Sequence, residues 1–302
     1  MTGGDGDEDR NGRRDDLGDE TRVLVEDGKG GERRVGTPEE VKLSTLDRGF
    51  LYGDAVFETL RCYDGAPAFL ERHVSRLNDA LEAVGIDVSF DAEGIEERVA
   101  AVTDGFAGDA YARITVTRGE RDGLLAPTEE TPTVVVHAKP LRRRVYPPAT
   151  VETTSEPRPV GVLARHKTAC YLPNVMAKGE TTAEADEALM LADGSVASGA
   201  VSNVFAVCDG CIETPDAGGR IREGVTREVV LEVADGMGYK TRIGELSLED
   251  SDAVFLTNTT WGVRAVESVD GRAYDAEHPV VKELSDTYLE RALSGSDERR
   301  QS

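Results

Sequence analysis

The stretch that decides the fold is SGAVSNVFAVCDGCIETPDAGGRIREGVTR, residues 198–227. Its first half holds an apolar run at 203–207 followed by Asp209-Gly210, and Asp-Gly between two apolar runs is typical of a β-hairpin turn. In its second half, Gly224 leads into a helix expected to start near Thr226. The first N–H groups of a helix lack partners within it, so this start suits a phosphate. The segment therefore predicts a hairpin followed by an anion-binding helix.

The two cysteines of this segment, Cys208 and Cys211, have a spacing found in redox and metal sites. They flank the Asp-Gly turn, so we interpret them as strand residues. No second Cys or His pair is placed to complete a zinc site, and four cysteines in 302 residues do not form a disulfide framework. We expect no metal.

The composition is strongly acidic, with 58 acidic against 35 basic residues and a net charge of −23. A negative field argues against nucleic-acid binding, and only seven of the basic residues are lysines. We interpret this charge as adaptation to a halophilic cytoplasm; the alternative is an ordinary acidic enzyme with an acidic tail. No stretch has the apolar length of a membrane span, and the N-terminus does not look like a secretory signal, so the expected compartment is the cytoplasm.

Helical periodicity and prolines divide the chain into two α+β parts. Apolar positions recur at helical spacing from Glu71 to Val84, and Gly85 ends that helix. Five prolines without periodicity between 140 and 159 predict a connection. The expected organisation is a disordered acidic tail (1–20), a smaller N-terminal α+β domain (21–139), an interdomain linker (140–159), a larger C-terminal domain (160–295) and a tail (296–302).

Three further stretches carry a family resemblance: DRGFLYGDAVFET at 47–59, HVSRL at 73–77 and RHKTACYLPNV at 165–175. Together with 198–227 they resemble the class IV pyridoxal-phosphate enzymes, which include branched-chain aminotransferases, D-amino acid aminotransferases and aminodeoxychorismate lyase. The match in order and spacing runs from about residue 21 to 292. The resemblance implies two α+β domains, pyridoxal 5'-phosphate in the cleft between them with the C-terminal domain binding it, and a homodimer.

Lys167 occupies the position of the family's Schiff-base lysine. Its amine has to be neutral to attack the cofactor aldehyde, and it then serves as the base for the substrate's α-proton. The alternative is a surface lysine, and Lys178 is its only nearby competitor. An arginine gives paired donors to phosphate oxygens. The resemblance assigns cofactor contacts to Arg76, Tyr171, Ser198, Asn203, Val225, Thr226, Thr259 and Thr260.

Substrate contacts are expected from Phe57, Arg118 and Arg264. Arg118 lies at a strand end where some family members hold a substrate carboxylate, and Arg264 is a second possibility for the same role. The alternative for either is a solvated arginine in an acidic protein.

Ser198 departs from the family, whose members usually carry a glutamate at this position. That carboxylate keeps the cofactor's pyridine nitrogen protonated and so strengthens the electron sink that aminotransferases need. A serine hydroxyl cannot hold the proton in the same way, whereas an elimination tolerates a neutral ring better. The alternatives are a carboxylate from elsewhere, such as Glu187, or a weakly active family member.

The sequence thus favours an aminodeoxychorismate lyase, which releases pyruvate and 4-aminobenzoate. The first alternative is a class IV aminotransferase acting on branched-chain or D-amino acids with 2-oxoglutarate. The second is a non-catalytic relative, which a pyridoxal-type spectrum bleached by borohydride would exclude.

Overall fold

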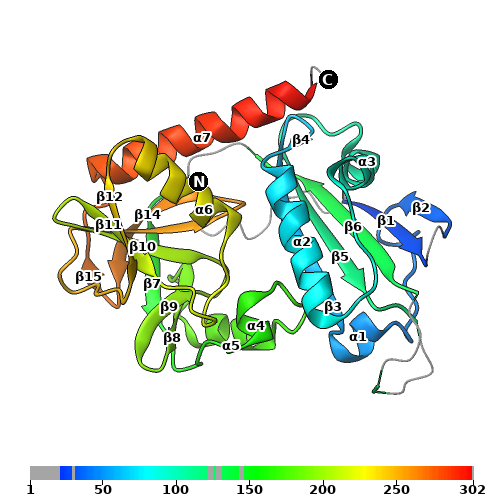
Figure 1. Cartoon of the computed structure of the whole chain (residues 1–302), viewed down its shortest axis with the longest axis horizontal. Coiled ribbons are helices and arrows are strands. Elements are labelled where there is room, and N and C mark those ends of the chain that lie inside the picture. The colour runs from blue at the N-terminus through cyan, green and yellow to red at the C-terminus, as the bar shows by residue number, and fades with distance from the viewer. Residues whose placement is uncertain (1–20, 29–30, 121–124, 127–130, 143–145, 301–302) are drawn as a thin grey trace, which may run out of the picture.

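The computed structural model describes residues 21–28, 31–120, 125–126, 131–142 and 146–300, the last five of these without their side chains. The predicted N-terminal tail, 1–20, lies outside the described residues. Two sheets form two lobes, and helix α7 (Pro279–Arg300) runs along the top of both (Figure 1). The α+β architecture expected from the sequence is confirmed.

The N-terminal sheet has six antiparallel strands in the order β2-β1-β6-β5-β3-β4. Because side chains alternate along a strand, one face of it is apolar: Leu60 on β3 and Ile114 on β5 pack against helices α2 and α3. The opposite face carries Phe57 and Arg113. The elements are β1 (Arg22–Asp27), β2 (Arg33–Gly36), α1 (Arg48–Tyr52), β3 (Ala55–Tyr63), β4 (Ala66–Pro67), α2 (Leu70–Val84), α3 (Ala92–Thr103), β5 (Ala110–Thr117) and β6 (Thr133–Pro140).

The second sheet has nine strands, eight of them in the order β12-β11-β10-β13-β14-β7-β8-β9, with β15 paired to β14. On β10, Phe205 stacks on Phe255 beneath helices α6 and α7, while Val204 belongs to the core on the other face. The elements are β7 (Ala149–Thr153), α4 (Val162–Arg165), α5 (Leu172–Glu180), β8 (Glu187–Ala192), β9 (Ser195–Gly199), β10 (Asn203–Cys208), β11 (Cys211–Pro215), α6 (Val225–Gly236), β12 (Lys240–Gly244), β13 (Ala253–Asn258), β14 (Gly262–Val269) and β15 (Arg272–Ala273).

The hairpin predicted in the opening segment is confirmed. Strands β10 and β11 pair, with Cys208 opposite Cys211, and both thiols are free. Asp209 and Gly210 take φ angles of 48° and 73°, the left-handed values that this tight turn requires. The Cys-x-x-Cys spacing is therefore a product of the hairpin.

The segment 140–159 was wrongly assigned as a linker throughout its length. Strand β7 lies inside it and is built into the second sheet between β14 and β8. Flanking prolines hid this short strand, although Ala149 and Val151 point into the core. At the other end, α7 continues to Arg300, through most of the tail expected at 296–302.

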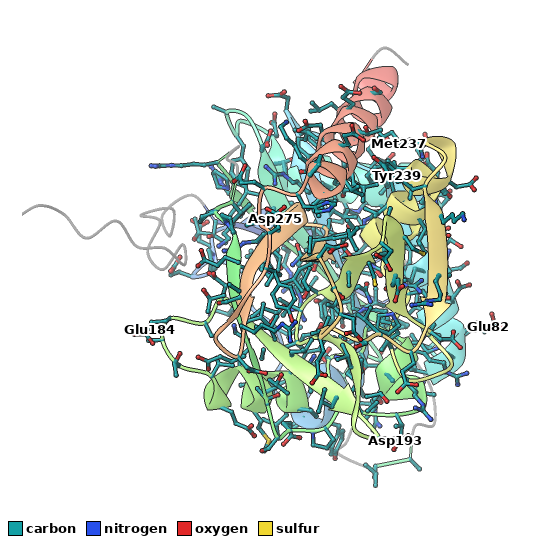
Figure 2. All side chains as sticks on the ribbon, turned by 90° about the vertical axis from the view of Figure 1, so that its left-hand side faces the viewer. Glu82, Glu184, Asp193, Met237, Tyr239 and Asp275 are labelled. Atoms are coloured by element: carbon teal, nitrogen blue, oxygen red, sulfur yellow. The ribbon has the colours of Figure 1, made fainter. Side chains whose placement is uncertain are left out.

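The acidic surface follows from the composition. Figure 2 shows Glu82, Glu184 and Asp193 at the periphery of the molecule, and all three are exposed. No helix in the described part of the chain is long and apolar enough to cross a membrane.

Candidate active site

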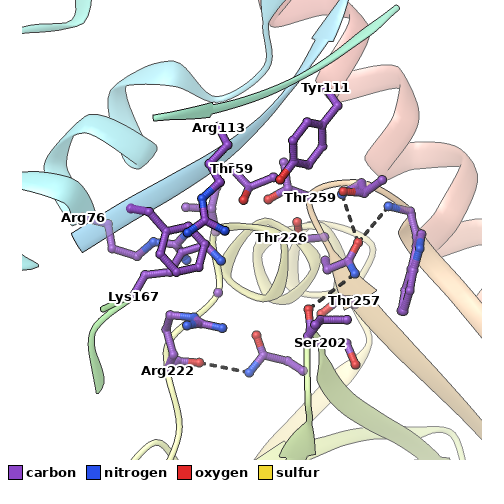
Figure 3. A pocket seen from close by; sticks show the side chains of 18 of the residues that line it. Thr59, Arg76, Tyr111, Arg113, Lys167, Ser202, Arg222, Thr226, Thr257 and Thr259 are labelled. Atoms are coloured by element: carbon purple, nitrogen blue, oxygen red, sulfur yellow. Dashed lines mark hydrogen bonds between the residues drawn. The ribbon is translucent and has the colours of Figure 1, made fainter. Parts of the chain in front are cut away.

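A cavity of about 290 Å³ lies between the two sheets (Figure 3). The polar face of the N-terminal sheet forms one wall, with Phe57 and Thr59 from β3 and Arg113 from β5. The start of α6 and the end of β13 form the other. The cavity is lined by Phe57, Thr59, Arg76, Tyr111, Arg113, Lys167, Tyr171, Val201, Ser202, Asn203, Arg222, Gly224, Val225, Thr226, Thr257, Asn258, Thr259, Thr260 and Trp261.

Lys167 is held at the cavity by backbone pairing with β3. The Phe57 amide donates to the Lys167 carbonyl at 2.8 Å, and the Ala169 amide donates to the Ala55 carbonyl at 2.8 Å. The lysine Nζ lies 4.0 Å from the centre of the Phe57 ring. Burial lowers the pKa of Lys167 to about 7, an effect that Arg222 reinforces. A substantial neutral fraction at physiological pH is what an amine needs to act as a nucleophile or a base.

Arg76 is oriented by a buried carboxylate. Its Nε and Nη2 donate to the two oxygens of Glu58 at 2.8 and 2.7 Å, and Nη1 donates to the Glu223 carbonyl at 3.1 Å. His73 Nδ1 lies 2.9 Å from Glu58 as well. Burial alone would raise the pKa of Glu58, but Arg76 and His73 outweigh it and hold that pKa well below its usual range. The guanidinium is thus fixed at the cavity wall.

The start of α6 forms an anion cradle beside Arg76. No side chain caps this helix at Gly224, so the amides of its first turn are left for another acceptor. A Cβ on Gly224 would lie 2.2 Å from Asn203 Oδ1, so a larger residue here would displace the Asn203 amide. A twelve-residue helix start with an adjacent arginine fits the phosphate of pyridoxal phosphate, and Lys167 fits its aldehyde.

The cavity is cationic in a protein that is otherwise acidic. Four of its lining residues are basic: Arg76, Arg113, Lys167 and Arg222. Among the described residues, no aspartate or glutamate lines it, and no group of three His, Cys, Asp or Glu could hold a metal. Such a site favours ligands with several negative charges.

Most residues that the sequence assigned to the site come together here. Nine line the cavity: Phe57, Arg76, Lys167, Tyr171, Asn203, Val225, Thr226, Thr259 and Thr260. Their individual roles remain predictions.

Arg118 and Arg264, assigned to the substrate, lie outside the lining residues and have structural partners. Arg118 donates to Asp54 and to the carbonyls of Val84 and Gly85, where α2 ends. Arg264 pairs with Asp186 and donates to the Pro147 carbonyl. Each arginine is buried, and neither reaches the lining of the cavity.

Ser198 is also absent from the lining residues; it is buried on β9 opposite Met190, and its hydroxyl donates to the Gly199 carbonyl at 3.0 Å. The serine that lines the cavity in the described part of the chain is Ser202, whose hydroxyl donates to the buried Glu187 at 2.8 Å. Glu187 therefore lies behind Ser202 and does not itself line the cavity.

Tyr111, Arg113 and Arg222 are among the lining residues that were not predicted from the sequence. On β5, Tyr111 and Arg113 alternate with core alanines, and β3 places Thr59 opposite Arg113. That alternation could have assigned both side chains to the face of Phe57. Arg222 lies in the loop between β11 and α6, where no periodicity indicates the direction of its side chain.

Comparison with known proteins identifies the family of this chain. Residues 55–269 match the family model described as Amino-transferase class IV. A putative branched-chain-amino-acid aminotransferase of Methanocaldococcus jannaschii is 34% identical over 82% of this chain and 91% of its own length. The aminodeoxychorismate lyase of Bacillus subtilis is 34% identical over 72% and 78%, respectively.

Solved structures of branched-chain aminotransferases and of an aminodeoxychorismate lyase resemble this chain in fold. The branched-chain aminotransferase of Thermoproteus uzoniensis has a TM-score of 0.82 at 26% identity and covers 92% of this chain and 96% of its own. The 4-amino-4-deoxychorismate lyase of Pseudomonas aeruginosa has a TM-score of 0.72 at 30% identity, covering 83% and 95%. A second branched-chain amino acid aminotransferase, complexed with N-(5'-phosphopyridoxyl)-L-glutamate, has a TM-score of 0.81 at 28% identity over 91% and 95%.

Proposed function

This chain belongs to the class IV aminotransferase family, which depends on pyridoxal phosphate, and we propose that it acts as an aminodeoxychorismate lyase. The observation that carries this choice is the lining of the cavity, which includes no carboxylate among the described residues. Without a carboxylate the cofactor's ring nitrogen stays mostly neutral, which suits elimination better than transamination.

Lys167 moves the proton. Bound pyridoxal phosphate supplies the electron sink. The neutral Lys167 amine takes the proton from the carbon that bears the substrate amine, and the enolpyruvyl C–O bond at the adjacent carbon breaks. The electron pair of that bond leaves with the oxygen, so that the leaving group is enolpyruvate. Protonation converts enolpyruvate to pyruvate, and the remaining ring becomes 4-aminobenzoate. No oxidant or keto acid is consumed.

Arg113 is the side chain we assign to a substrate carboxylate. Its guanidinium lies 3.6 Å from the centre of the Phe57 ring, at the wall facing Trp261 and the β13 end. Burial disfavours the charged form of Arg113 and lowers its pKa, so a bound carboxylate would stabilise the positive charge of the guanidinium. Arg113→Met should lower kcat/KM about 10- to 100-fold, the value of one charge-assisted hydrogen bond. Arg220→Met, at an exposed arginine paired with Asp193, is the control.

The deciding assay measures products. Purified protein loaded with pyridoxal phosphate receives aminodeoxychorismate without any keto acid, and 4-aminobenzoate and pyruvate are quantified. We expect equal amounts of both over many turnovers, with the cofactor remaining in its aldehyde form. A requirement for 2-oxoglutarate, together with conversion of leucine or a D-amino acid, would reject the lyase.

The aminotransferase remains the second candidate because of Glu187. This carboxylate is fully buried and accepts hydrogen bonds from Ser202 Oγ and from the amides of Ala188 and Val201. Through its hydrogen bond with Ser202, the negative charge of Glu187 would act on the cavity and favour a protonated nitrogen in the cofactor ring. Burial raises the pKa of Glu187, which weakens it as a source of negative charge, so we rank this candidate second.

We also propose that the chain forms a homodimer. Large apolar side chains are exposed on α1 and α5, among them Phe50 (69% exposed), Leu172 (67%) and Val175 (62%). The two helices are neighbours, because the Cys170 thiol just before α5 lies 3.6 Å from the Gly53 carbonyl that follows α1. A contiguous apolar area of this kind is typical of a protein interface. Sedimentation of Leu172→Glu, which should give monomers, tests it.

The net charge of −23 supports a salt-adapted cytoplasmic enzyme. Carboxylates that repel one another destabilise the compact state, and salt screens that repulsion. Thermal unfolding in increasing KCl should show a rising midpoint; a midpoint that is independent of salt would contradict the proposal.

A further inference from the structure

Arg222 enters the cavity beside Lys167 and contacts Tyr171. Its Nη2 donates to the Tyr171 hydroxyl at 3.2 Å, and both side chains line the cavity (Figure 3 labels Arg222 and Lys167). The phenol ring packs edge-on against Phe57, with centroids 5.2 Å apart, and Lys167 Nζ lies 5.5 Å from its centre. The phenol is therefore fixed by Phe57 on one side and by Arg222 at its oxygen.

Cations surround this phenol. Burial would raise the pKa of Tyr171, but Arg222, Lys167 and Arg158 outweigh it and lower that pKa to about 7. Arg158 is itself buried, and its Nε has no hydrogen-bond partner among the described residues. The charged groups that face the phenol are Arg76, Arg113, Arg158, Lys167 and Arg222.

The direction of the hydrogen bond decides what the tyrosine can do. A guanidinium only donates, so Tyr171 Oη accepts from Arg222, and the phenol's own proton is left for an acceptor in the cavity. The positive charge of the Arg222 guanidinium beside the oxygen makes the phenol a stronger donor. No carboxylate of the described residues lines the cavity to hold a proton on the ring nitrogen. The Arg222–Tyr171 pair, in contrast, brings positive charge to the cavity.

We propose that Arg222 is a positioning residue that polarises Tyr171, so that the Arg222–Tyr171 pair provides the electrostatic pull on the bound cofactor. The proposal rests on the cofactor site of the proposed function and holds for elimination and transamination alike. It can therefore fail while the lyase assignment stands, and the reverse is also true.

The first test is the protonation of the lysine–cofactor linkage, followed by its absorbance as the pH is raised without substrate. In Arg222→Leu the Tyr171 phenol loses its charged partner and becomes a weaker donor, so the linkage pKa should rise by about one to two pH units. Arg220→Leu is the matched control, because this arginine is exposed and outside the cavity; it should leave the pKa unchanged. An unchanged pKa in Arg222→Leu overturns the proposal.

The second test asks whether Arg222 acts through the tyrosine. In a Tyr171→Phe background, Arg222→Leu should shift the linkage pKa by less than half as much. An equal shift in both backgrounds would show that Arg222 acts as a bare charge, and would overturn the proposed role of the pair.

A third measurement needs no cofactor. Tyrosinate absorbance of the cofactor-free protein should include one group titrating near pH 7, absent from Tyr171→Phe and moved to higher pH in Arg222→Leu. The same titration in wild type and Arg222→Leu contradicts the proposal, even where the variant binds the cofactor poorly.

Discussion

Replacing Glu58 by glutamine tests the buried support of Arg76. The carboxylate is 1% exposed and has three close partners: Nε and Nη2 of Arg76 at 2.8 and 2.7 Å, and His73 Nδ1 at 2.9 Å. Glutamine keeps the shape but removes the charge and one acceptor oxygen. Breaking a buried ion pair costs about 3–5 kcal/mol, and because glutamine retains one acceptor we expect about 3 kcal/mol.

That loss corresponds to a fall of about 5 °C in the unfolding midpoint, measurable by calorimetry near neutral pH. Affinity for pyridoxal phosphate should also fall, because Arg76 is no longer oriented. The matched control is Glu228→Gln, which removes the same charge from an exposed pair with Arg72 and should cost less than about 1 kcal/mol.

The pH dependence has a definite sign. The pKa of Glu58 is lowered in the folded protein, so its stabilisation is present above the usual range of a glutamate and is lost as the pH falls toward the folded value. Wild type and Glu58→Gln should therefore converge in stability in acid. Equal destabilisation by Glu58→Gln and Glu228→Gln at neutral pH would refute the reasoning.

Other predictions concern the cradle, the core and the lysine. Gly224→Ala places a methyl group 2.2 Å from Asn203 Oδ1, so fluorescence titration should show at least tenfold weaker cofactor binding; wild-type affinity would contradict the cradle. Phe205→Ala removes a fully buried ring stacked 4.8 Å from Phe255 and should lower the free energy of unfolding by about 3–5 kcal/mol in denaturant titration. Because the pKa of Lys167 is about 7, the rate at which the cofactor-free protein reacts with pyridoxal phosphate should rise through pH 7 and level off above it; a rise only above pH 9 would contradict this.

The local signals in the sequence predicted the elements that depend on local chemistry. Asp209-Gly210 indicated a hairpin because only a left-handed turn joins those strands, and Gly85 ended α2 with a φ of 70°. Strand β7 was missed because its place in the sheet depends on pairing with β14 and β8, which are distant in sequence.

For the site, the family motifs predicted nine of the residues that line the cavity, Arg76 among them, but not Arg113 or Arg222. Arg118 and Arg264 looked like binding residues, yet each meets carbonyls and a carboxylate contributed by distant segments. Arg113 and Arg222 reach the cavity because of sheet register and loop path, respectively. Whether a side chain points into a cavity depends on the assembled fold and cannot be deduced from the residue type.

The most direct test of the account is chemical labelling of the lysine. The protein loaded with pyridoxal phosphate is reduced with borohydride, digested, and its modified peptide is identified by mass spectrometry. We predict the phosphopyridoxyl group on Lys167, and its loss in Lys167→Ala. Labelling at Lys178, or a spectrum that persists unchanged in Lys167→Ala, would contradict the assignment of the cavity as the cofactor site.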